Sequence, residues 1–554
     1  MIEMKNKLIF FSLILLVLFT VSAVSAEENM ADFTDDLLTA DSSNGNFNDL
    51  NYGINESPNE FKLDRDYVYD EDTDANFTGG IAFSKNNFML DGNGHSIDGN
   101  NIARIFDVTG SNITLKNLII KNANNGAISL NPAANAVYYM DNVTIQNCSS
   151  QKLYGGINVV ESNLIVTNSQ FISNTGIDAA DILTNDGNVT VLKSTFEGGN
   201  ETKWAHIAFY GGSLIVENST FANSVSRYSN AIYGEDVQVN VRNTKFRNLT
   251  VYETAGAIAV KKQANLTVSD CEFTNITAYK DAGAIFADIA LGSTNIINST
   301  FNGGFVEFGG AIMQLGGDLT ISNSNFKDNQ AVFDGGAIWT SYANVTIENS
   351  TFEKNKNIKK DAEIGGVLYF DNGNIIIRTS TFIDNHGSSN GDAIFTYDSK
   401  LTLENSTFKD NGYAVYSVFG TNSISDDIIL NDDLISSNNT YYSTIVVNDG
   451  VELEINSTVF HFDTLPDKFD LRDYGLVGPV RDQGYMGSCW TFATSSALES
   501  SLLKETGKLY DFSQDHIQNT MLQYSIWGVK GIVEGAHAAT GVVYLVNWYG
   551  PYPT

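Results

Sequence analysis

The chain has 554 residues, enough for several domains or one long repeat array, and 65 acidic residues against 32 basic ones give it a formal net charge of −33. This charge argues against nucleic acid or an anionic membrane surface as a partner, because binding to either would bring like charges together. After residue 26 no stretch approaches the roughly 18 consecutive apolar residues that a membrane-spanning helix needs.

Residues 1–26 are typical of a secretory signal peptide. Lys5 and Lys7 precede an almost wholly apolar run over residues 8–21, and small residues at 22–26 form a cleavage site. The alternative is that the apolar run is retained as a membrane anchor. We expect the protein to be secreted or held at the cell surface.

Residues 27–79 are predicted to form a linker and an N-terminal cap, because the part up to residue 59 is rich in Asn, Asp and Ser with little periodicity. The acidic run Asp70-Glu-Asp-Thr-Asp74 could attract calcium, or it could be a solvated loop. The run Asp91-Gly-Asn-Gly-His95 lacks the glycine and glutamate that an EF-hand has at its sixth and twelfth positions. We predict no metal site and no cofactor.

Residues 80–458 contain an internal repeat. Short strands with alternating apolar residues, turns rich in Gly and Asn, and a phrase close to Asn-Ser-Thr-Phe recur together. Three short strands in each repeat predict a right-handed parallel β-helix, in which each coil buries its apolar face against its neighbours. The recurring phenylalanines are Phe171, Phe196, Phe221, Phe246, Phe273, Phe301, Phe326, Phe352, Phe382 and Phe408.

An asparagine stands three residues before most of these phenylalanines. Stacked in successive coils, the asparagines could form an amide ladder along one corner. They could equally be turn residues that tolerate left-handed backbone dihedrals. The asparagines are Asn168, Asn218, Asn243, Asn298, Asn323, Asn349 and Asn405.

Two cysteines fall within the repeat. Cys148 and Cys271 are about five coils apart, so stacking separates them by roughly 24 Å along the solenoid axis. A disulfide requires Cα atoms within about 7 Å of each other. We therefore predict that both are free thiols.

The aspartates of the repeat raise the question of a second activity, because some polysaccharide lyases and hydrolases carry catalytic carboxylates on a β-helix. None of them forms a distinctive pair in sequence, so we interpret them as solvated. The repeat resembles adhesin-like surface proteins of methanogenic archaea, which implies a cell-wall or surface polysaccharide as a partner. The aspartates considered are Asp181, Asp186, Asp334 and Asp371.

A second domain is predicted over residues 465–554, after a linker at 459–464. Its segment Gln483-Gly-Tyr-Met-Gly-Ser-Cys489-Trp490 runs into a stretch with helical apolar spacing. This places Cys489 at a helix N-terminus, where the helix dipole and unpaired N–H groups stabilise a thiolate. Cys489 is therefore the candidate nucleophile.

The run from Leu465 to Trp490 resembles the start of mature papain-like cysteine peptidases. The resemblance implies the N-terminal, mainly α half of a papain-like α+β domain that hydrolyses protein or peptide substrates. Cys489 would be the nucleophile, and the Gln483 amide with the Cys489 N–H would form the oxyanion hole. The substrate site would include Gly487, Ser488, Trp490 and Gly535.

The sequence departs from that family in two places. Met486 stands where the local signature has its first cysteine, so the usual disulfide is missing. The family's catalytic histidine and asparagine lie roughly 130–150 residues beyond the nucleophile, whereas His516 and His537 come much earlier. We expect residues 1–554 to be inactive by themselves.

Two functions follow from these patterns. The first is an exported or cell-surface cysteine peptidase carried on a β-helical, adhesin-like stalk. The alternative is a surface adhesin or carbohydrate-binding protein whose peptidase module is inactive or truncated. A histidine and an asparagine at the family spacing would favour the first.

Overall fold

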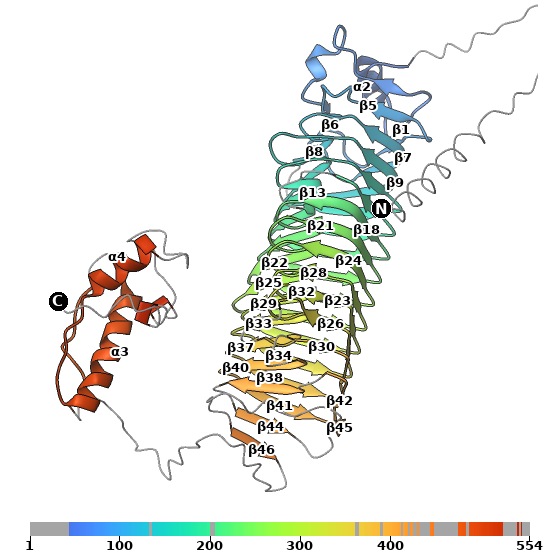
Figure 1. Cartoon of the computed structure of the whole chain (residues 1–554). Coiled ribbons are helices and arrows are strands. Elements are labelled where there is room, and N and C mark those ends of the chain that lie inside the picture. Colours follow the sequence, from blue (N-terminus) through green and yellow to red (C-terminus); the bar gives the residue numbers. More distant parts are fainter. Residues whose placement is uncertain are drawn as a thin grey trace, which may run out of the picture. The chain divides into compact units, whose positions relative to one another are not determined.

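The computed structural model divides into two compact units, Met1–Thr458 and Val459–Thr554, which are described separately (Figure 1). It describes residues 44–524 with gaps at 132–135, 200–204, 360–364, 388–391, 412–413, 419–420, 425–428, 431–443, 448–471, 473–474 and 484–486, together with residues 540, 541, 544 and 545. The predicted signal peptide at 1–26 and the predicted linker at 459–464 lie outside the described residues.

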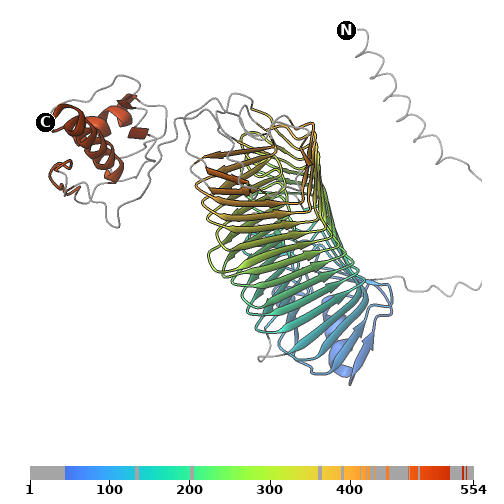
Figure 2. The same cartoon turned by 90° about the horizontal axis from the view of Figure 1, so that it is seen from below.

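The first unit is a parallel β-solenoid, as the repeat predicted (Figures 1 and 2). One face is a sheet of 14 described strands, here called the narrow sheet, and a sheet of 32 described strands, the wide sheet, forms the rest of the wall. Each strand pairs in parallel with the equivalent strand one coil away, so that Phe171 aligns with Phe196 and Leu164 with Val189.

The narrow sheet contains one strand from each coil. Its strands are β3 (Ile81–Phe83), β6 (Phe106–Val108), β8 (Ile128–Leu130), β10 (Ile157–Val160), β13 (Ala179–Asn185), β16 (Ala205–Tyr210), β19 (Ile232–Glu235), β22 (Ile258–Lys262), β25 (Ile285–Ile289), β29 (Ile312–Leu315), β33 (Ile338–Ser341), β37 (Leu368–Asp371), β40 (Ile394–Tyr397) and β43 (Val415–Val418).

The wide sheet contributes two or three short strands to most coils. The strands that begin this part of each coil are β1 (Glu60–Lys62), β4 (Phe88–Asp91), β7 (Ile113–Lys121), β9 (Val137–Gln146), β11 (Asn163–Thr167), β14 (Asn188–Leu192), β17 (Ser213–Glu217), β20 (Gln238–Arg242), β23 (Asn265–Ser269), β26 (Ser293–Ile297), β30 (Asp318–Ser322), β34 (Asn344–Glu348), β38 (Asn374–Arg378), β41 (Lys400–Glu404), β44 (Thr421–Ile424) and β46 (Thr444–Val447). The strands that follow them are β2 (Tyr67–Val68), β5 (Ser96–Asp98), β12 (Gln170–Ile172), β15 (Thr195–Glu197), β18 (Thr220–Ser226), β21 (Lys245–Val251), β24 (Glu272–Ala278), β27 (Thr300–Asn302), β28 (Phe305–Val306), β31 (Asn325–Lys327), β32 (Gln330–Ala331), β35 (Thr351–Glu353), β36 (Lys356–Asn357), β39 (Thr381–Ile383), β42 (Thr407–Lys409) and β45 (Ile429–Leu430).

The recurring phenylalanines form a continuous stack inside the solenoid. From Phe171 to Phe408 neighbouring rings lie 4.5–5.2 Å apart between centroids and within 9° of parallel. Isoleucine, valine and leucine from both sheets pack around them in one apolar core. A single coil could not bury these side chains, so the stacking of coils supplies both the core and the backbone hydrogen bonds.

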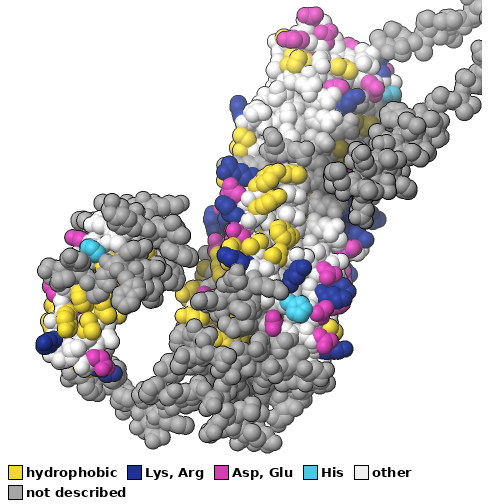
Figure 3. Space-filling model, in the orientation of Figure 1, with side chains coloured by type: hydrophobic (Ala, Val, Ile, Leu, Met, Phe, Trp, Pro, Cys, Tyr) yellow, Lys and Arg dark blue, Asp and Glu magenta, His cyan; other side chains and the backbone are white. Residues whose placement is uncertain are grey.

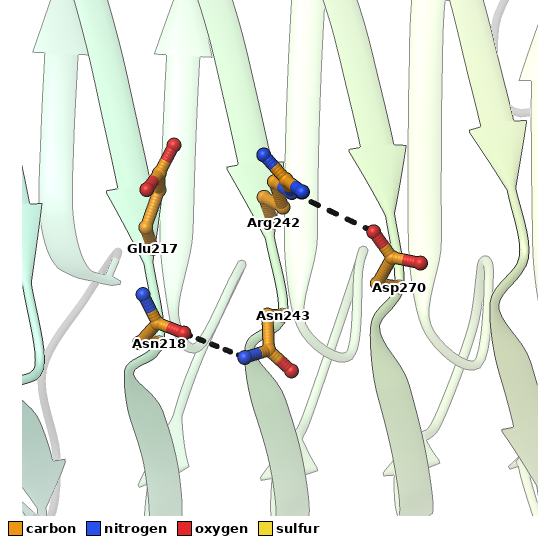
Figure 4. Close-up of a pocket in the computed structure, with 5 residues that line it drawn as sticks. All are labelled: Glu217, Asn218, Arg242, Asn243 and Asp270. Atoms are coloured by element: carbon orange, nitrogen blue, oxygen red, sulfur yellow. Dashed lines mark hydrogen bonds and ion pairs between the residues drawn. The ribbon is translucent and has the colours of Figure 1, made fainter.

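The asparagines at the corner before the phenylalanines combine the two predicted roles, since they adopt left-handed dihedrals and also bond to one another. Asn218 and Asn243 have φ of 52° and 46°, in the left-handed region, and Asn243 Nδ2 donates to Asn218 Oδ1 at 2.6 Å (Figure 4). A surface pocket of about 530 Å³ lies here, with Arg242 3.6 Å from Asp270. Lys193, Asp270 and Thr379 occupy the corner in other coils, so the exposed amide ladder is interrupted.

A second asparagine ladder, which the sequence analysis missed, runs inside the solenoid three residues after the phenylalanines. Asn329, Asn355, Asn385 and Asn411 are at most 1% exposed, and each of the first three donates from Nδ2 to the Oδ1 of the next at 2.9–3.0 Å. Each side-chain oxygen also accepts a backbone N–H from the preceding coil. These bonds satisfy polar groups that would otherwise be costly to bury.

Helix α2 (Phe47–Glu56) covers the N-terminal end of the solenoid, because Phe47, Leu50 and Ile54 are buried in the common core. Asp74 is fully buried and accepts the N–H groups of Phe47 and Asn48 at 2.9 and 3.0 Å. The solvated interpretation of this aspartate was therefore wrong, since the carboxylate caps a helix.

The first coil begins earlier than the boundary at residue 80 that the sequence suggested. Strand β1 pairs with β4 and β2 pairs with β5, so the solenoid already starts at Glu60. Residues 60–68 lack the Asn-Ser-Thr-Phe phrase, and only the parallel pairing assigns them to a coil.

The second unit contains two described helices, α3 (Cys489–Thr506) and α4 (Gln514–Tyr524), as expected for a mainly α segment. Helix α3 ends at Gly507, whose φ of 68° is the left-handed conformation common after a helix. Within the residues that the structure describes, no helix is long and apolar enough to cross a membrane.

Candidate active site

Cys489 is the first residue of α3, as the sequence predicted, and its side chain is exposed. The N-cap residue Ser488 makes no side-chain capping bond, and the first turn contains no acidic residue. Negative charge on Cys489 Sγ would therefore meet the positive end of the helix dipole without a competing carboxylate in that turn. The thiol is thus open to solvent at the start of α3.

An ion pair ties the segment before the cysteine to the middle of α3. Arg481 Nη1 donates to Glu499 Oε2 at 2.8 Å, and Arg481 Nη2 donates to Asp511 at 2.5 Å. Glu499 is 1% exposed, and its other oxygen accepts the N–H of Phe512 at 2.8 Å. The Glu499 carboxylate raises the pKa of Arg481. The sequence analysis missed this pair, although charges of opposite sign on either side of Cys489 could have suggested it.

The pair bears on the predicted oxyanion residue Gln483, two positions after Arg481. Gln483 is half-buried, and the residues 484–486 that connect it to the helix lie outside the described part. Arg481 therefore holds the chain against α3 two residues before Gln483.

The residues expected at the substrate site differ in exposure. Trp490 is 3% exposed and packs with Ile517, Met521 and Tyr544, and within the described residues its Nε1 has no hydrogen-bond partner. Its ring therefore belongs to the interior between α3 and α4. Gly487 is half-buried, Ser488 is 2% exposed, and Gly535 lies outside the described residues.

His516 lies on α4 and contacts a buried residue of the same unit. Its Nδ1 lies 2.8 Å from the hydroxyl of Tyr544, which is fully buried. The sequence analysis placed His516 too early in the chain to be the family's base, and the contact shows what its ring does instead, which is to pack against Tyr544. His537 lies outside the described residues.

The other two cysteines are free thiols inside the solenoid, as predicted. Burial raises the pKa of Cys148 to about 12 and that of Cys271 to about 11. Cys271 replaces a serine in a column of buried hydroxyls, and its thiol lies 3.1 Å from the Ser269 carbonyl oxygen. Neither is a nucleophile near neutral pH, because the thiolate is the reactive form.

Two of the four aspartates predicted to be solvated are not. Asp181 is 1% exposed, and burial raises the pKa of Asp334 to about 7. Asp186 is exposed, and Asp371 accepts the Ser341 hydroxyl at 2.9 Å. The pattern of the sequence did not reveal which turn side chains lie under neighbouring coils.

Asp181 belongs to a buried polar chain that resembles a catalytic triad in composition. Its Oδ2 lies 2.5 Å from His206 Nδ1, and His206 Nε2 lies 3.0 Å from Ser224 Oγ, which donates to Asn230 at 2.5 Å. All four residues are at most 4% exposed. A substrate could not reach Ser224, so we assign this chain a structural role inside the solenoid.

Comparisons with known families divide the chain in the same way. Residues 465–528 match the family described as papain family cysteine protease, and residues 136–288 and 289–460 match the family described as right handed beta helix region. The solved tailspike protein 3 of bacteriophage CBA120 aligns over 75% of this chain and 60% of its own, with 10% identity and a TM-score of 0.26.

Curated relatives align with the C-terminal segment. The chain is 40% identical over 67 residues to the oryzain gamma chain of Oryza sativa subsp. japonica, 56% identical over 52 residues to cysteine proteinase 1 of Zea mays, and 42% identical over 60 residues to cathepsin 7 of Rattus norvegicus. These alignments cover 12%, 9% and 11% of this chain. The chain spans 18%, 14% and 18% of those relatives.

Proposed function

Because the chain belongs to the family of right-handed β-helix proteins and carries a papain-like cysteine protease segment at residues 465–528, we propose that it is a cysteine-type peptidase whose nucleophile is Cys489. The observation that carries the proposal is the exposed thiol at the first residue of α3, within the matched segment. The substrate class is a protein or peptide.

In the proposed reaction Cys489 Sγ attacks the carbonyl carbon of the scissile peptide bond and forms a carbon–sulfur bond. The oxyanion is stabilised by the Cys489 backbone N–H and the Gln483 side-chain amide. A general base, an imidazole in papain-like enzymes, takes the thiol proton. The carbon–nitrogen bond then breaks, and the protonated base, now a general acid, gives that proton to the leaving amine. Water hydrolyses the thioester and regenerates the thiol.

Thiol labelling of the whole protein tests the identity of the nucleophile. We expect iodoacetamide near pH 7 to label Cys489 at least about a hundredfold faster than Cys148 and Cys271, because the latter two are buried with raised pKa values. Mass spectrometry of tryptic peptides reports the three rates. Equal rates for the three cysteines would contradict the assignment.

Peptide hydrolysis tests the reaction itself. Because residues 1–554 are expected to be inactive by themselves, it is measured on a protein that also supplies a histidine and an asparagine at the family spacing. Cys489→Ala should abolish turnover, and Gln483→Ala should slow it by about a hundredfold, the typical loss for one oxyanion donor. Cys271→Ser is the matched control, since it removes a buried thiol of the solenoid and no residue of the matched peptidase segment, and it should leave turnover unchanged. Turnover that survives Cys489→Ala would overturn the proposal.

Export is a second part of the proposal and rests on residues 1–26. The two lysines, the apolar run and the small residues before Glu27 support secretion or display at the cell surface. N-terminal sequencing of protein from its own cells should begin at Glu27. A mature chain that still begins at Met1 would favour a retained anchor.

The alternative function, a surface adhesin or carbohydrate-binding protein, is favoured by one feature of the solenoid. Aromatic side chains and carboxyl groups gather on the outside of the narrow sheet. These groups belong to the solenoid, so the alternative function does not require Cys489.

A further inference from the structure

Acceptor triplets for N-glycosylation, Asn-x-Ser or Asn-x-Thr without an intervening proline, recur along the first unit. Chance in a repeat rich in Asn, Ser and Thr would place them at exposed and buried asparagines alike. The triplets that lie in described residues instead begin at exposed asparagines or, at residue 265, at a half-buried one: Asn55, Asn76, Asn112, Asn142, Asn147, Asn188, Asn218, Asn248, Asn265, Asn275, Asn298, Asn344, Asn349 and Asn405. None of the buried asparagines in the described part begins a triplet, and these are Asn174, Asn230, Asn329, Asn355, Asn357, Asn385 and Asn411.

Along the corner before the phenylalanines, triplets begin only in coils that are not neighbours. Strand register places the corner residues of successive coils in one column. Neighbouring coils lie about 4.8 Å apart, which is too close for a bulky saccharide on each. The asparagines of intervening coils lack the serine or threonine two positions later, and these are Asn168, Asn243 and Asn323. In this column the triplets begin at Asn142, Asn218, Asn298, Asn349 and Asn405.

The side-chain nitrogen of Asn218 is free, unlike that of Asn298, whose Nδ2 donates to Asp270 at 2.6 Å. Lys193 occupies the corner one coil before Asn218 and has no side-chain oxygen. Within the residues that the structure describes, Asn218 Nδ2 therefore donates to no partner. Asn218 Oδ1 accepts from Asn243, and this bond would remain if a substituent replaced one hydrogen on Nδ2.

The triplet at this corner presents its two recognition groups on one side. Ser219, in the middle, is 3% exposed and donates its hydroxyl to the Glu217 carbonyl oxygen at 2.8 Å. Asn218 is exposed and Thr220 is half-buried, so both lie on the outer side of the wall. Side chains two positions apart share a face of an extended chain. The acceptor amide and the hydroxyl are thus accessible together.

The surface beside Asn218 has room for a first sugar. The pocket of about 530 Å³ is lined by Glu217, Asn218, Arg242, Asn243 and Asp270. Figure 4 shows Asn218 Nδ2 turned away from Asn243 and towards Glu217. The carboxylates and the guanidinium around it can accept from and donate to sugar hydroxyls. Figure 3 shows long stretches of the solenoid surface with neither apolar nor charged side chains, which suit a hydrophilic modification.

We propose that Asn218 carries an N-linked saccharide, a proposal that rests on the export proposed above. The donor is a saccharide on a lipid phosphate, and a membrane-bound transferase of the cell catalyses the transfer. Asn218 Nδ2 attacks C1 of the first sugar, so that a nitrogen–carbon bond forms and the C1–O bond to the phosphate breaks. The lipid phosphate leaves with the bonding electron pair. The amide nitrogen releases one proton to a base of the transferase, and no group is oxidised or reduced.

Mass spectrometry of tryptic peptides, from protein isolated from its own cells, tests the proposal. Peptide 204–227 contains the triplet at Asn218 and no other. We expect a saccharide mass on this peptide in the wild type and its complete loss in Thr220→Val, which removes the triplet but keeps the asparagine. Thr220→Ser restores a triplet and should retain the mass. Asn223, exposed in the same peptide but outside a triplet, is the internal control and should stay unmodified.

The outcomes separate this proposal from export. An unmodified peptide 204–227 from chains that begin at Glu27 would overturn the proposal and leave export intact. Chains that begin at Met1 and carry no saccharide would overturn both. A saccharide that persists in Thr220→Val, or that fragmentation locates on Asn223, would overturn the assignment to Asn218. Circular dichroism of both Thr220 variants verifies that they fold.

Discussion

The carboxyl of Asp334 makes the stability of the solenoid depend on pH, and Asp334→Asn should remove that dependence. Burial raises the pKa of Asp334 from 3.8 to about 7. Between these values the folded protein keeps a proton that the unfolded chain has released. The free energy of unfolding is therefore highest below the ordinary pKa and falls as pH rises towards 7.

The size of the effect follows from that difference. One pKa unit corresponds to about 1.4 kcal/mol, so ionised Asp334 costs the fold up to about 4 kcal/mol above pH 7. Asparagine has a similar shape and does not ionise. The advantage of Asp334→Asn over the wild type should grow by about 2 kcal/mol between pH 5.5 and pH 8.

Urea unfolding followed by circular dichroism at several pH values measures this advantage. The control is Asp371→Asn, because Asp371 accepts hydrogen bonds from Ser341 and Asn372 at 2.9 and 2.7 Å. That variant should be less stable than the wild type by a similar amount at both pH values, since its loss is one of hydrogen bonds. Parallel pH profiles for Asp334→Asn and the wild type would refute the reasoning.

Three further substitutions test the fold. Asn355→Ala should lower the free energy of unfolding by about 3 kcal/mol, because it leaves buried groups of the inner asparagine ladder without partners. Asn349→Gly on the exposed corner should lower it by only about 0.5 kcal/mol. Similar losses for the two variants in urea unfolding would contradict the ladder. Cys271→Ser should change the midpoint of calorimetric unfolding by less than about 2 °C from the wild type, because serine occupies the equivalent position in other coils. A larger drop would contradict the equivalence of Cys271 with these serines. Arg481→Met should destabilise the second unit by about 3 kcal/mol, because Glu499 would remain buried without its cationic partner. Thermal melts followed by circular dichroism at 222 nm measure the loss. An unchanged melt would show that the ion pair is dispensable.

The sequence by itself predicted the repeat and the place of Cys489 at the start of a helix. Ten phenylalanines at nearly constant spacing could be buried together only if coils stacked in register, and the structure has them as one column of parallel rings. Cys489 at the first residue of α3 followed from the helical spacing after it. Both features depend on local periodicity, which a single sequence displays directly.

Tertiary structure decided which of two similar residues faces inward. Asn349 stands three residues before Phe352 and is exposed at a corner, whereas Asn355 stands three residues after it and is fully buried. The two have the same side chain and nearly the same local surroundings in sequence. Their difference arises from the path of the neighbouring coil, whose carbonyl and amide groups are supplied by residues 26 to 30 positions away.

The aspartates illustrate the same limit. Asp186 and Asp334 both stand beside glycine in a turn, yet Asp186 is solvated and Asp334 lies partly beneath its neighbours with a raised pKa. Burial of a turn side chain depends on contacts with the coils above and below, and these contacts leave no periodic mark in the sequence. The sequence determined that coils stack, and only the stacked structure determined which polar groups the stacking removes from water.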